Sequence, residues 1–259
     1  MTTAIQRDPR FEFYECVTGL DDQRTRSLER EEVHIWHAQV DDASCTGIAR
    51  LAQVLSQDEK ERAGRFRFEK NRNEFIFNRA TLRILLASYL RAAASELCFT
   101  YSSYGKPYLA APESARALAF NLAHTDGMLV LAFAWERKIG VDIENIRKDL
   151  EVEEIAERFF SPAERRALRD VSPEDRHEAF FRCWTRKEAY IKARGEGLSH
   201  PLHEFDVSVI PQDTAALLAT RPDPTEARRW LLREIPTGSG YIAALAVEAD
   251  SADPCHYGY

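Results

Sequence analysis

The residues best suited to chemistry include two acidic side chains in the middle of the chain. Asp142 and Glu144 alternate with Val141 and Ile143 in a short segment whose pattern predicts a strand. Residues two apart in a strand point to the same face, so the two carboxylates share one face while the apolar side chains face the core. Such a pair is typical either of the solvent-exposed face of a sheet or of part of a metal site.

Three further residues, Trp184, Glu188 and Lys192, recur every four positions in a predicted helix and lie roughly on one of its faces. By itself this pattern is typical of a buried tryptophan beside a surface Glu-Lys pair, and we expect Trp184 to pack the helix against a sheet. If the helix brings Glu188 to Asp142 and Glu144, the three carboxylates form an oxygen-rich site suited to Mg²⁺.

Local signals predict the elements that must position these residues. Ser172 and Pro173 supply an N-cap and a first helical residue, and Gly195 supplies a left-handed stop, so we expect one helix to span most of this stretch. Capping boxes that start at Ser56 and Ser161 predict two further helix starts, the first opening a basic helical region of about forty residues. Strands are predicted at 33–40, 128–135, 140–144, 205–210 and 241–247, and residues 1–30 are expected to wrap the surface.

Composition bounds the class of protein. The 259 residues suffice for one large domain or two small ones, and 44% hydrophobic with 30% charged residues indicates a soluble globular protein. No apolar run could span a bilayer and residues 1–30 lack a signal core, so we expect a cytoplasmic protein without a membrane partner. A net charge of -7 disfavours a nucleic-acid partner. Five scattered cysteines without Cys-x-x-Cys spacing argue against a disulfide framework or a zinc site.

Basic residues offer anion-binding candidates. Most arginines between 62 and 83 are expected on a solvated helix face, but Arg79 and Arg83 lie deep in a predicted helix over 75–90 and are better candidates, because a guanidinium can chelate phosphate oxygens. Lys106 and Pro107 belong to a rigid turn of a kind that is more often structural than functional. A lone histidine beside a strand, such as His124, is usually a packing residue.

In order and spacing, these motifs resemble those of the 4'-phosphopantetheinyl transferase superfamily, the long surfactin-synthetase-activating type. The resemblance covers about residues 56–210, and each motif alone is weak whereas four in order are specific. It rests on Gly105-Lys106-Pro107, Phe120-Asn121-Leu122-Ala123-His124, Gly140-Val141-Asp142-Ile143-Glu144 and the stretch from Trp184 to Leu198, with Phe159-Phe160-Ser161 and Glu164 between them. One difference is Ala123, where the family usually has Ser before the motif histidine, which weakens the case for a hydroxyl contact to the cofactor phosphate.

The resemblance implies an α/β (α+β) fold, the 4'-phosphopantetheinyl transferase fold, in which two similar α/β halves form a pseudo-dimer with coenzyme A in the cleft between them. We expect residues 1–136 to form the N-terminal half, at the nucleotide end of coenzyme A, and residues 137–259 to form the C-terminal half, with the metal-binding and catalytic motifs. An internal pseudo-dimer makes a monomer the expected state.

The implied activity is transfer of the 4'-phosphopantetheine arm of coenzyme A to a serine of an acyl or peptidyl carrier protein, with release of adenosine 3',5'-bisphosphate. By this resemblance, Mg²⁺ would be held against the pyrophosphate by Asp142, Glu144 and Glu188. Glu188, or a water it orients, would take the serine proton, and Lys192 would neutralise or protonate the leaving phosphate. The positions that grip the nucleotide end would be Arg79, Lys106, Pro107 and His124. The carrier protein could serve fatty-acid, polyketide or nonribosomal-peptide biosynthesis.

Two other functions use the same residues. A non-catalytic module that binds coenzyme A or a carrier protein would keep the fold but would have no need for three carboxylates and a lysine. A Mg²⁺-dependent nucleotide pyrophosphatase would use the same groups with water as the nucleophile, and analysis of the products separates it from a transferase.

Overall fold

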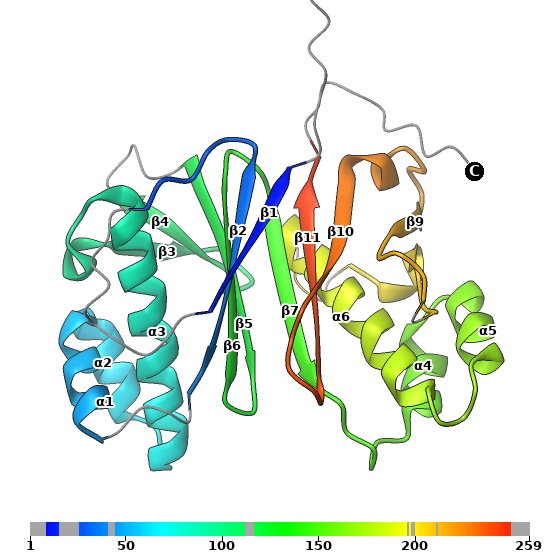
Figure 1. Ribbon diagram of the computed structural model, residues 1–259, viewed down its shortest axis with the longest axis horizontal. Helices are drawn as coiled ribbons and strands as arrows, with labels where there is room; N and C mark the ends of the chain where they lie inside the picture. Colours follow the sequence, from blue (N-terminus) through cyan, green and yellow to red (C-terminus); the bar gives the residue numbers. More distant parts are fainter. Residues whose placement is uncertain are drawn as a thin grey trace, which may run out of the picture.

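The chain builds two halves, each with a long helix packed on an antiparallel or mostly antiparallel sheet. The computed structural model describes residues 9–15, 26–40, 45–111, 117–195, 197, 200–210 and 212–249. Helices lie on the two outer sides and the two sheets meet in the middle (Figure 1). The predicted mixture of helices and sheets is therefore confirmed.

The first half is organised around a four-stranded sheet in the order β1-β2-β6-β5, in which β1 pairs parallel with β2 and the other pairs are antiparallel. Its long helix α3 (Glu69–Leu90) packs on this sheet together with two shorter helices, and a hairpin follows. The strands are β1 (Arg10–Glu15), β2 (Glu32–Gln39), β5 (Leu118–Thr125) and β6 (Met128–Trp135); the shorter helices are α1 (Cys45–Leu51) and α2 (Gln57–Gly64); the hairpin is β3 (Cys98–Tyr101) with β4 (Pro107–Ala111).

The second half has a three-stranded antiparallel sheet in the order β10-β11-β7, covered by the long helix α6 (Arg176–Arg194). Two short helices and a small two-stranded sheet complete it. The strands are β7 (Ile139–Asn145), β8 (Phe205–Val207), β9 (Leu217–Thr220), β10 (Trp230–Ile235) and β11 (Tyr241–Glu248), and the short helices are α4 (Val152–Phe159) and α5 (Pro162–Asp170).

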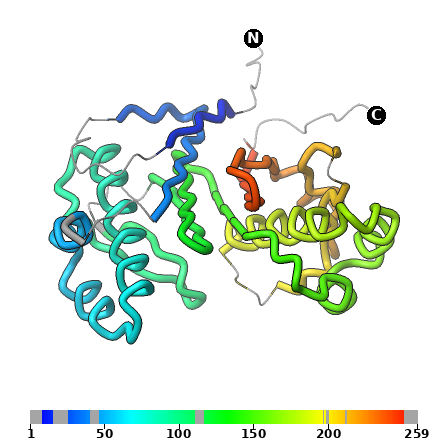
Figure 2. Tube along the Cα trace, turned by 60° about the horizontal axis from the view of Figure 1, so that its bottom comes forward, coloured from blue at the N-terminus to red at the C-terminus, as the bar shows by residue number. Residues whose placement is uncertain are grey.

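The halves share one apolar core. A single buried cluster mixes side chains of both sheets, among them Ile35 and Val130 from the first half and Val141 and Leu245 from the second. The Asn121 side chain on β5 also accepts a hydrogen bond at 2.9 Å from the backbone N–H of Val141 on β7. Figure 2 shows the two lobes side by side. The division into 1–136 and 137–259 remains a prediction.

Several predicted boundaries are confirmed and others are wrong. Both capping boxes form, and Gly195 ends α6 with a φ of 76°. However, α6 begins at Arg176, because Ser172 instead starts a turn in which its hydroxyl donates to Asp175 at 2.9 Å. The forty-residue helical region is broken at 65–68, and residues 10–15 add a strand that the sequence did not predict. Within the described ranges, no helix is long and apolar enough to cross a membrane.

Candidate functional site

Gly140 allows the helix to reach the strand that carries the acidic pair. A Cβ atom at this position would lie 2.2 Å from the carbonyl oxygen of Ala189 and 2.3 Å from the backbone nitrogen of Ala193, both in α6. Only glycine permits so close an approach of helix backbone to strand. The approach places the last two turns of α6 directly over β7, where Asp142 and Glu144 lie.

The contact between Asp142 and Lys192 is the centre of the site. The Nζ atom of Lys192 donates to Oδ1 of Asp142 at 2.6 Å, which joins α6 to β7. Asp142 is buried, and burial raises the pKa of its carboxyl while the ammonium of Lys192 opposes that rise. Its second oxygen, Oδ2, is also buried and has no hydrogen-bond partner among the described residues. One oxygen of Asp142 is thus used by Lys192, and the other is left for a ligand.

Glu144 and Glu188 lie close enough to Asp142 to sense its charge. Burial, followed by the negative charge of Asp142, raises the pKa of Glu188 to about 7, although the ammonium of Lys192 opposes the rise. Burial also raises the pKa of Glu144, and the negative charge of Asp142 is the next largest cause of that rise. Each of these two glutamates therefore lies near Asp142, and their grouping as one site stays a prediction.

These carboxylates fit a hard divalent cation. Buried carboxylates that raise one another's pKa are stabilised by a cation, and Mg²⁺ prefers oxygen ligands. The unpartnered Oδ2 of Asp142 supports this fit. Within the described part of the chain, no group of three or more His, Cys, Asp or Glu side chains has the geometry of a formed metal site.

Two of the residues predicted at the nucleotide end lie near Lys192. His124 lies at the end of β5; partial burial lowers the pKa of its imidazole, the charge of Glu74 on α3 opposes this, and the charge of Lys192 lowers it further. Lys106, in the turn of the β3-β4 hairpin, donates to the carbonyl oxygens of Lys192 at 2.6 Å and Ile139 at 3.1 Å. His124 and Lys106 thus both lie near Lys192.

Arg79 and Arg83 are held by one buried carboxylate. Arg79 pairs with Glu59 at 2.8 Å and donates to the Tyr101 hydroxyl at 2.6 Å. Arg83 pairs with the other oxygen of Glu59 at 2.6 Å and also donates to the carbonyl oxygens of residues 94 and 97. The contacts of Arg83 explain its burial without any ligand. Arg79, beside the exposed Tyr101 ring, keeps its predicted role as a proposal.

Comparison with known proteins gives the family. Residues 138–246 match the family model described as the 4'-phosphopantetheinyl transferase superfamily, and residues 42–136 match that of a 4'-phosphopantetheinyl transferase N-terminal region. The chain is 35% identical to the 4'-phosphopantetheinyl transferase HetI of Nostoc over 90% of this chain and 94% of that protein. It is 30% identical to the 4'-phosphopantetheinyl transferase Sfp of Bacillus subtilis strain 168, over 61% of this chain and 68% of Sfp. The chain belongs to the 4'-phosphopantetheinyl transferase superfamily.

The predicted family, fold class and enzyme class are thereby confirmed. Members of the superfamily act on coenzyme A and carrier proteins, so this transferase is an enzyme whose chemistry is phosphopantetheine transfer. The roles of individual site residues, the metal and the kind of carrier protein belong to the proposal below.

Two residues of the transferase motifs had no predicted role and prove structural. Asn121 ties β5 to β7 through the N–H of Val141, one residue before Asp142, and so links the two halves beside the acidic pair. Ala123, which stands where the family usually has Ser, is buried in the core shared by the two sheets. The sequence sign that could have indicated this role of Asn121 is a polar residue inside an otherwise apolar pair of strands.

Trp184 packs differently from the expectation. Its ring lies edge-on to Phe159 of α4 and stacks on Phe180, with ring centroids 5.9 Å apart in each case. It is partly buried at the edge of the core of the second half. The predicted structural role is supported: its ring partners lie on α4 and on α6 itself, and the cluster that it packs against includes residues of the sheet.

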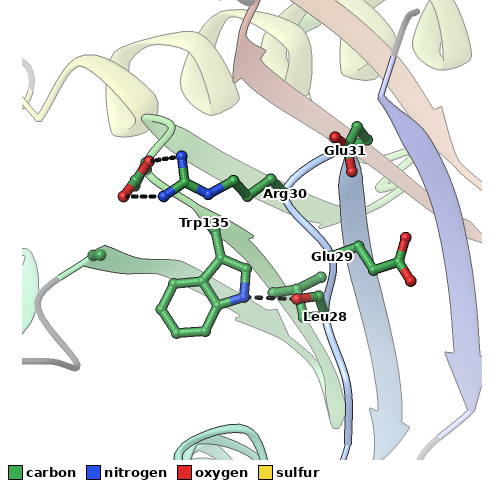
Figure 3. A pocket seen from close by; sticks show the side chains of 7 residues that line it. Leu28, Glu29, Arg30, Glu31 and Trp135 are labelled. Carbon is green, nitrogen blue, oxygen red and sulfur yellow. Dashed lines mark hydrogen bonds and ion pairs between the residues drawn. The ribbon is translucent and has the colours of Figure 1, made fainter.

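A hollow of about 560 Å³ in the first half lies apart from this machinery. It is lined by Leu28, Glu29, Arg30, Glu31, Ala117, Trp135 and Glu136. Arg30 pairs with Glu136, and the Trp135 indole donates to the carbonyl of Leu28 at 2.8 Å, whereas the carboxylates of Glu29 and Glu31 pair with neither (Figure 3). The hollow contains none of the predicted site residues.

Proposed function

We propose that this transferase moves the 4'-phosphopantetheine arm of coenzyme A onto a serine of an acyl or peptidyl carrier protein, with Mg²⁺, and releases adenosine 3',5'-bisphosphate. The observation that carries the proposal is the arrangement at Asp142: one oxygen accepts from Lys192, and the other is buried with no hydrogen-bond partner in the part of the chain that the structure describes. A carboxylate placed between a lysine and other carboxylates suits a site for a metal-bound pyrophosphate.

In this proposal Asp142, Glu144 and Glu188 hold Mg²⁺, which when bound would neutralise charge on the pyrophosphate oxygens. The serine oxygen attacks the phosphorus that bears the pantetheine arm, and the bond from this phosphorus to the oxygen of the adenosine-bearing phosphate breaks. Glu188, or a water it orients, takes the serine proton as the serine oxygen attacks. Lys192 neutralises or protonates the departing phosphate.

The nucleotide end is proposed to lie along Arg79, Pro107, His124 and the hairpin turn at Lys106. This placement is supported by the position of His124 near Lys192, whose charge lowers its pKa. It is also supported by the exposed rings of Tyr101, Tyr104 and Tyr108 on the same hairpin.

The carrier protein is proposed to dock near the end of β7, where basic side chains follow the acidic pair. Arg165 is already paired with Glu157 at 2.7 Å, so the exposed basic residues are better candidates. These are Arg147, Lys148, Arg158 and Arg166. If an acidic carrier docks there, its KM should rise with salt more than the KM for coenzyme A does. A cytoplasmic, monomeric enzyme remains our expectation.

The decisive experiment is intact-mass spectrometry of an apo carrier protein incubated with this protein, Mg²⁺ and coenzyme A. A mass gain of one phosphopantetheine on the serine supports the proposal. Release of free phosphopantetheine with an unmodified carrier would instead indicate a pyrophosphatase, and binding without any product would indicate a non-catalytic module. Glu188→Gln is the matched control for background modification.

A further inference from the structure

Lys106 belongs to the first half of the molecule, but its ammonium contacts the second half. It lies in the turn between β3 and β4, yet its Nζ atom donates to the carbonyl oxygens of Lys192 at 2.6 Å, Ile139 at 3.1 Å and Ala193 at 3.5 Å. An ammonium has three N–H donors and no acceptor. Three carbonyl partners therefore account for its whole donor capacity.

Two of these carbonyls are ones that a helix leaves without a partner. Lys192 and Ala193 belong to the last turn of α6, where the carbonyl groups have no N–H four residues further along the same helix. The C-terminus of a helix also carries partial negative charge, which a cation stabilises. Lys106 thus caps α6 from outside the half to which α6 belongs.

The hairpin around Lys106 fits against the chain that leaves α6. Gly195 and Gly197 both adopt positive φ, 76° and 60°. A Cβ at Gly195 would lie 3.1 Å from the Tyr108 hydroxyl, and one at Gly197 would lie 2.8 Å from the Tyr104 ring. Larger residues would push the hairpin away, so the two glycines keep Lys106 within reach of the helix end.

We propose that Lys106 is a positioning residue that clamps the end of α6 to the first half and thereby holds Lys192 over Asp142. Lys192 is fixed at both ends: its carbonyl accepts from Lys106, and its ammonium donates to Asp142. Burial lowers the pKa of Lys106 to about 8, which agrees with an ammonium removed from water but still charged at neutral pH. The link to catalysis rests on the proposed function, whereas the clamp itself does not.

The first test needs no substrate. Hydrogen exchange of the free protein should show that Lys106→Met exchanges about tenfold faster in peptides covering 190–200 and 98–111, because a charged cap has been lost. Lys138→Met is the matched control: Lys138 is an exposed lysine whose charge is felt at Lys106, and its removal should leave this exchange unchanged. Unchanged exchange in Lys106→Met would overturn the proposal even if the protein proved not to be a transferase.

The second test uses transfer kinetics. A positioning role predicts that Lys106→Met lowers kcat about tenfold with little change in the KM for coenzyme A, and that this loss disappears in a Lys192→Met background. A raised KM for coenzyme A with normal exchange would identify Lys106 as a nucleotide ligand instead. If Lys106→Met does not fold, Lys106→Gln, whose side chain is shorter and uncharged, must show the same faster exchange, and normal protection there would reject the clamp.

Discussion

The Nζ atom of Lys192 lies 2.6 Å from Oδ1 of Asp142 and ties the last turns of α6 to β7. Because Oδ2 of Asp142 is buried without a partner among the described residues, the same carboxylate can serve a lysine and a metal ion at once. The contact brings together two residues fifty positions apart in sequence at the centre of the candidate site.

Removing the Asp142 carboxylate should abolish transfer without unfolding the protein. Asp142→Asn keeps the shape of the side chain but loses the charge that attracts Mg²⁺, so we expect no measurable transfer and no heat of Mg²⁺ binding in calorimetry. Since burial raises the pKa of this carboxyl, the charged form is costly in the folded state, and the melting temperature should stay the same or rise. Near-normal transfer at moderate Mg²⁺ would refute the assignment.

The pKa of Glu188 predicts how Mg²⁺ binding depends on pH. A folded-state pKa near 7, above the ordinary 4.5, means that the folded protein binds the extra proton. Stability from this group is therefore fully present below pH 4.5 and is lost as the pH rises through about 7. Mg²⁺ must displace that proton, so the rise in melting temperature caused by Mg²⁺ should be larger at pH 8 than at pH 6.

Glu188→Gln is the control for this pH dependence. The amide cannot titrate, so the difference between the two pH values should shrink, while Mg²⁺ binding weakens at both. Equal Mg²⁺ stabilisation of the natural protein at pH 6 and pH 8 would show that Glu188 releases no proton on binding.

The sequence places the candidate site residues on particular faces of their elements, but it does not reveal the contacts that support them. Period-two and period-four patterns fixed the faces of Asp142, Glu144 and Glu188, because those periods follow directly from strand and helix geometry. The contact from Lys106 to the end of α6 spans 86 positions and involves backbone carbonyls, which leave no trace in residue types.

The sequence also did not reveal the ion-pair partner of Arg79 and Arg83 or the residue at which α6 begins. The sequence suggested an anion site at Arg79 and Arg83, but a buried Glu59 from another helix supplies a carboxylate for both. Ser172 is a good N-cap residue, yet its hydroxyl is used by Asp175 in a turn that precedes the helix. In each case the partner comes from a contact that residue type alone does not reveal.

Gly140→Ala should damage the site through packing alone. The new methyl group would sit 2.2 Å from the Ala189 carbonyl oxygen, so α6 must shift away from β7. We expect urea unfolding to show a loss of about 1–3 kcal/mol, together with a lower kcat as Lys192 moves from Asp142. Gly64→Ala is the control: nothing lies within 4 Å of a Cβ there, and its stability should be unchanged or higher. Equal stability of the two variants would disprove the close approach.

Arg79 could bind the nucleotide of coenzyme A or serve only to stabilise the fold, and the two roles predict different kinetics. Arg79 is proposed to hold the 3'-phosphate of coenzyme A, which is remote from the reacting pyrophosphate, and dephospho-coenzyme A lacks that group. The natural enzyme should prefer coenzyme A by more than about tenfold in kcat/KM, since a charge-assisted contact contributes roughly 1.5–3 kcal/mol. Arg79→Ala should lose most of this preference and mainly raise the KM for coenzyme A, whereas Lys192→Ala should mainly lower kcat.

Arg83→Met is the matched control for that measurement, because Arg83 shares the Glu59 carboxylate with Arg79 and is otherwise bonded only to backbone carbonyls among the described residues. Its loss should lower stability, since a buried carboxylate loses one of two cations, while the preference for coenzyme A survives. Arg79→Ala also weakens the hold on Glu59, so a fall in melting temperature alone does not establish a role in binding. If both variants keep the full preference for coenzyme A and both lose stability, Arg79 serves only to neutralise Glu59 and the 3'-phosphate is held elsewhere.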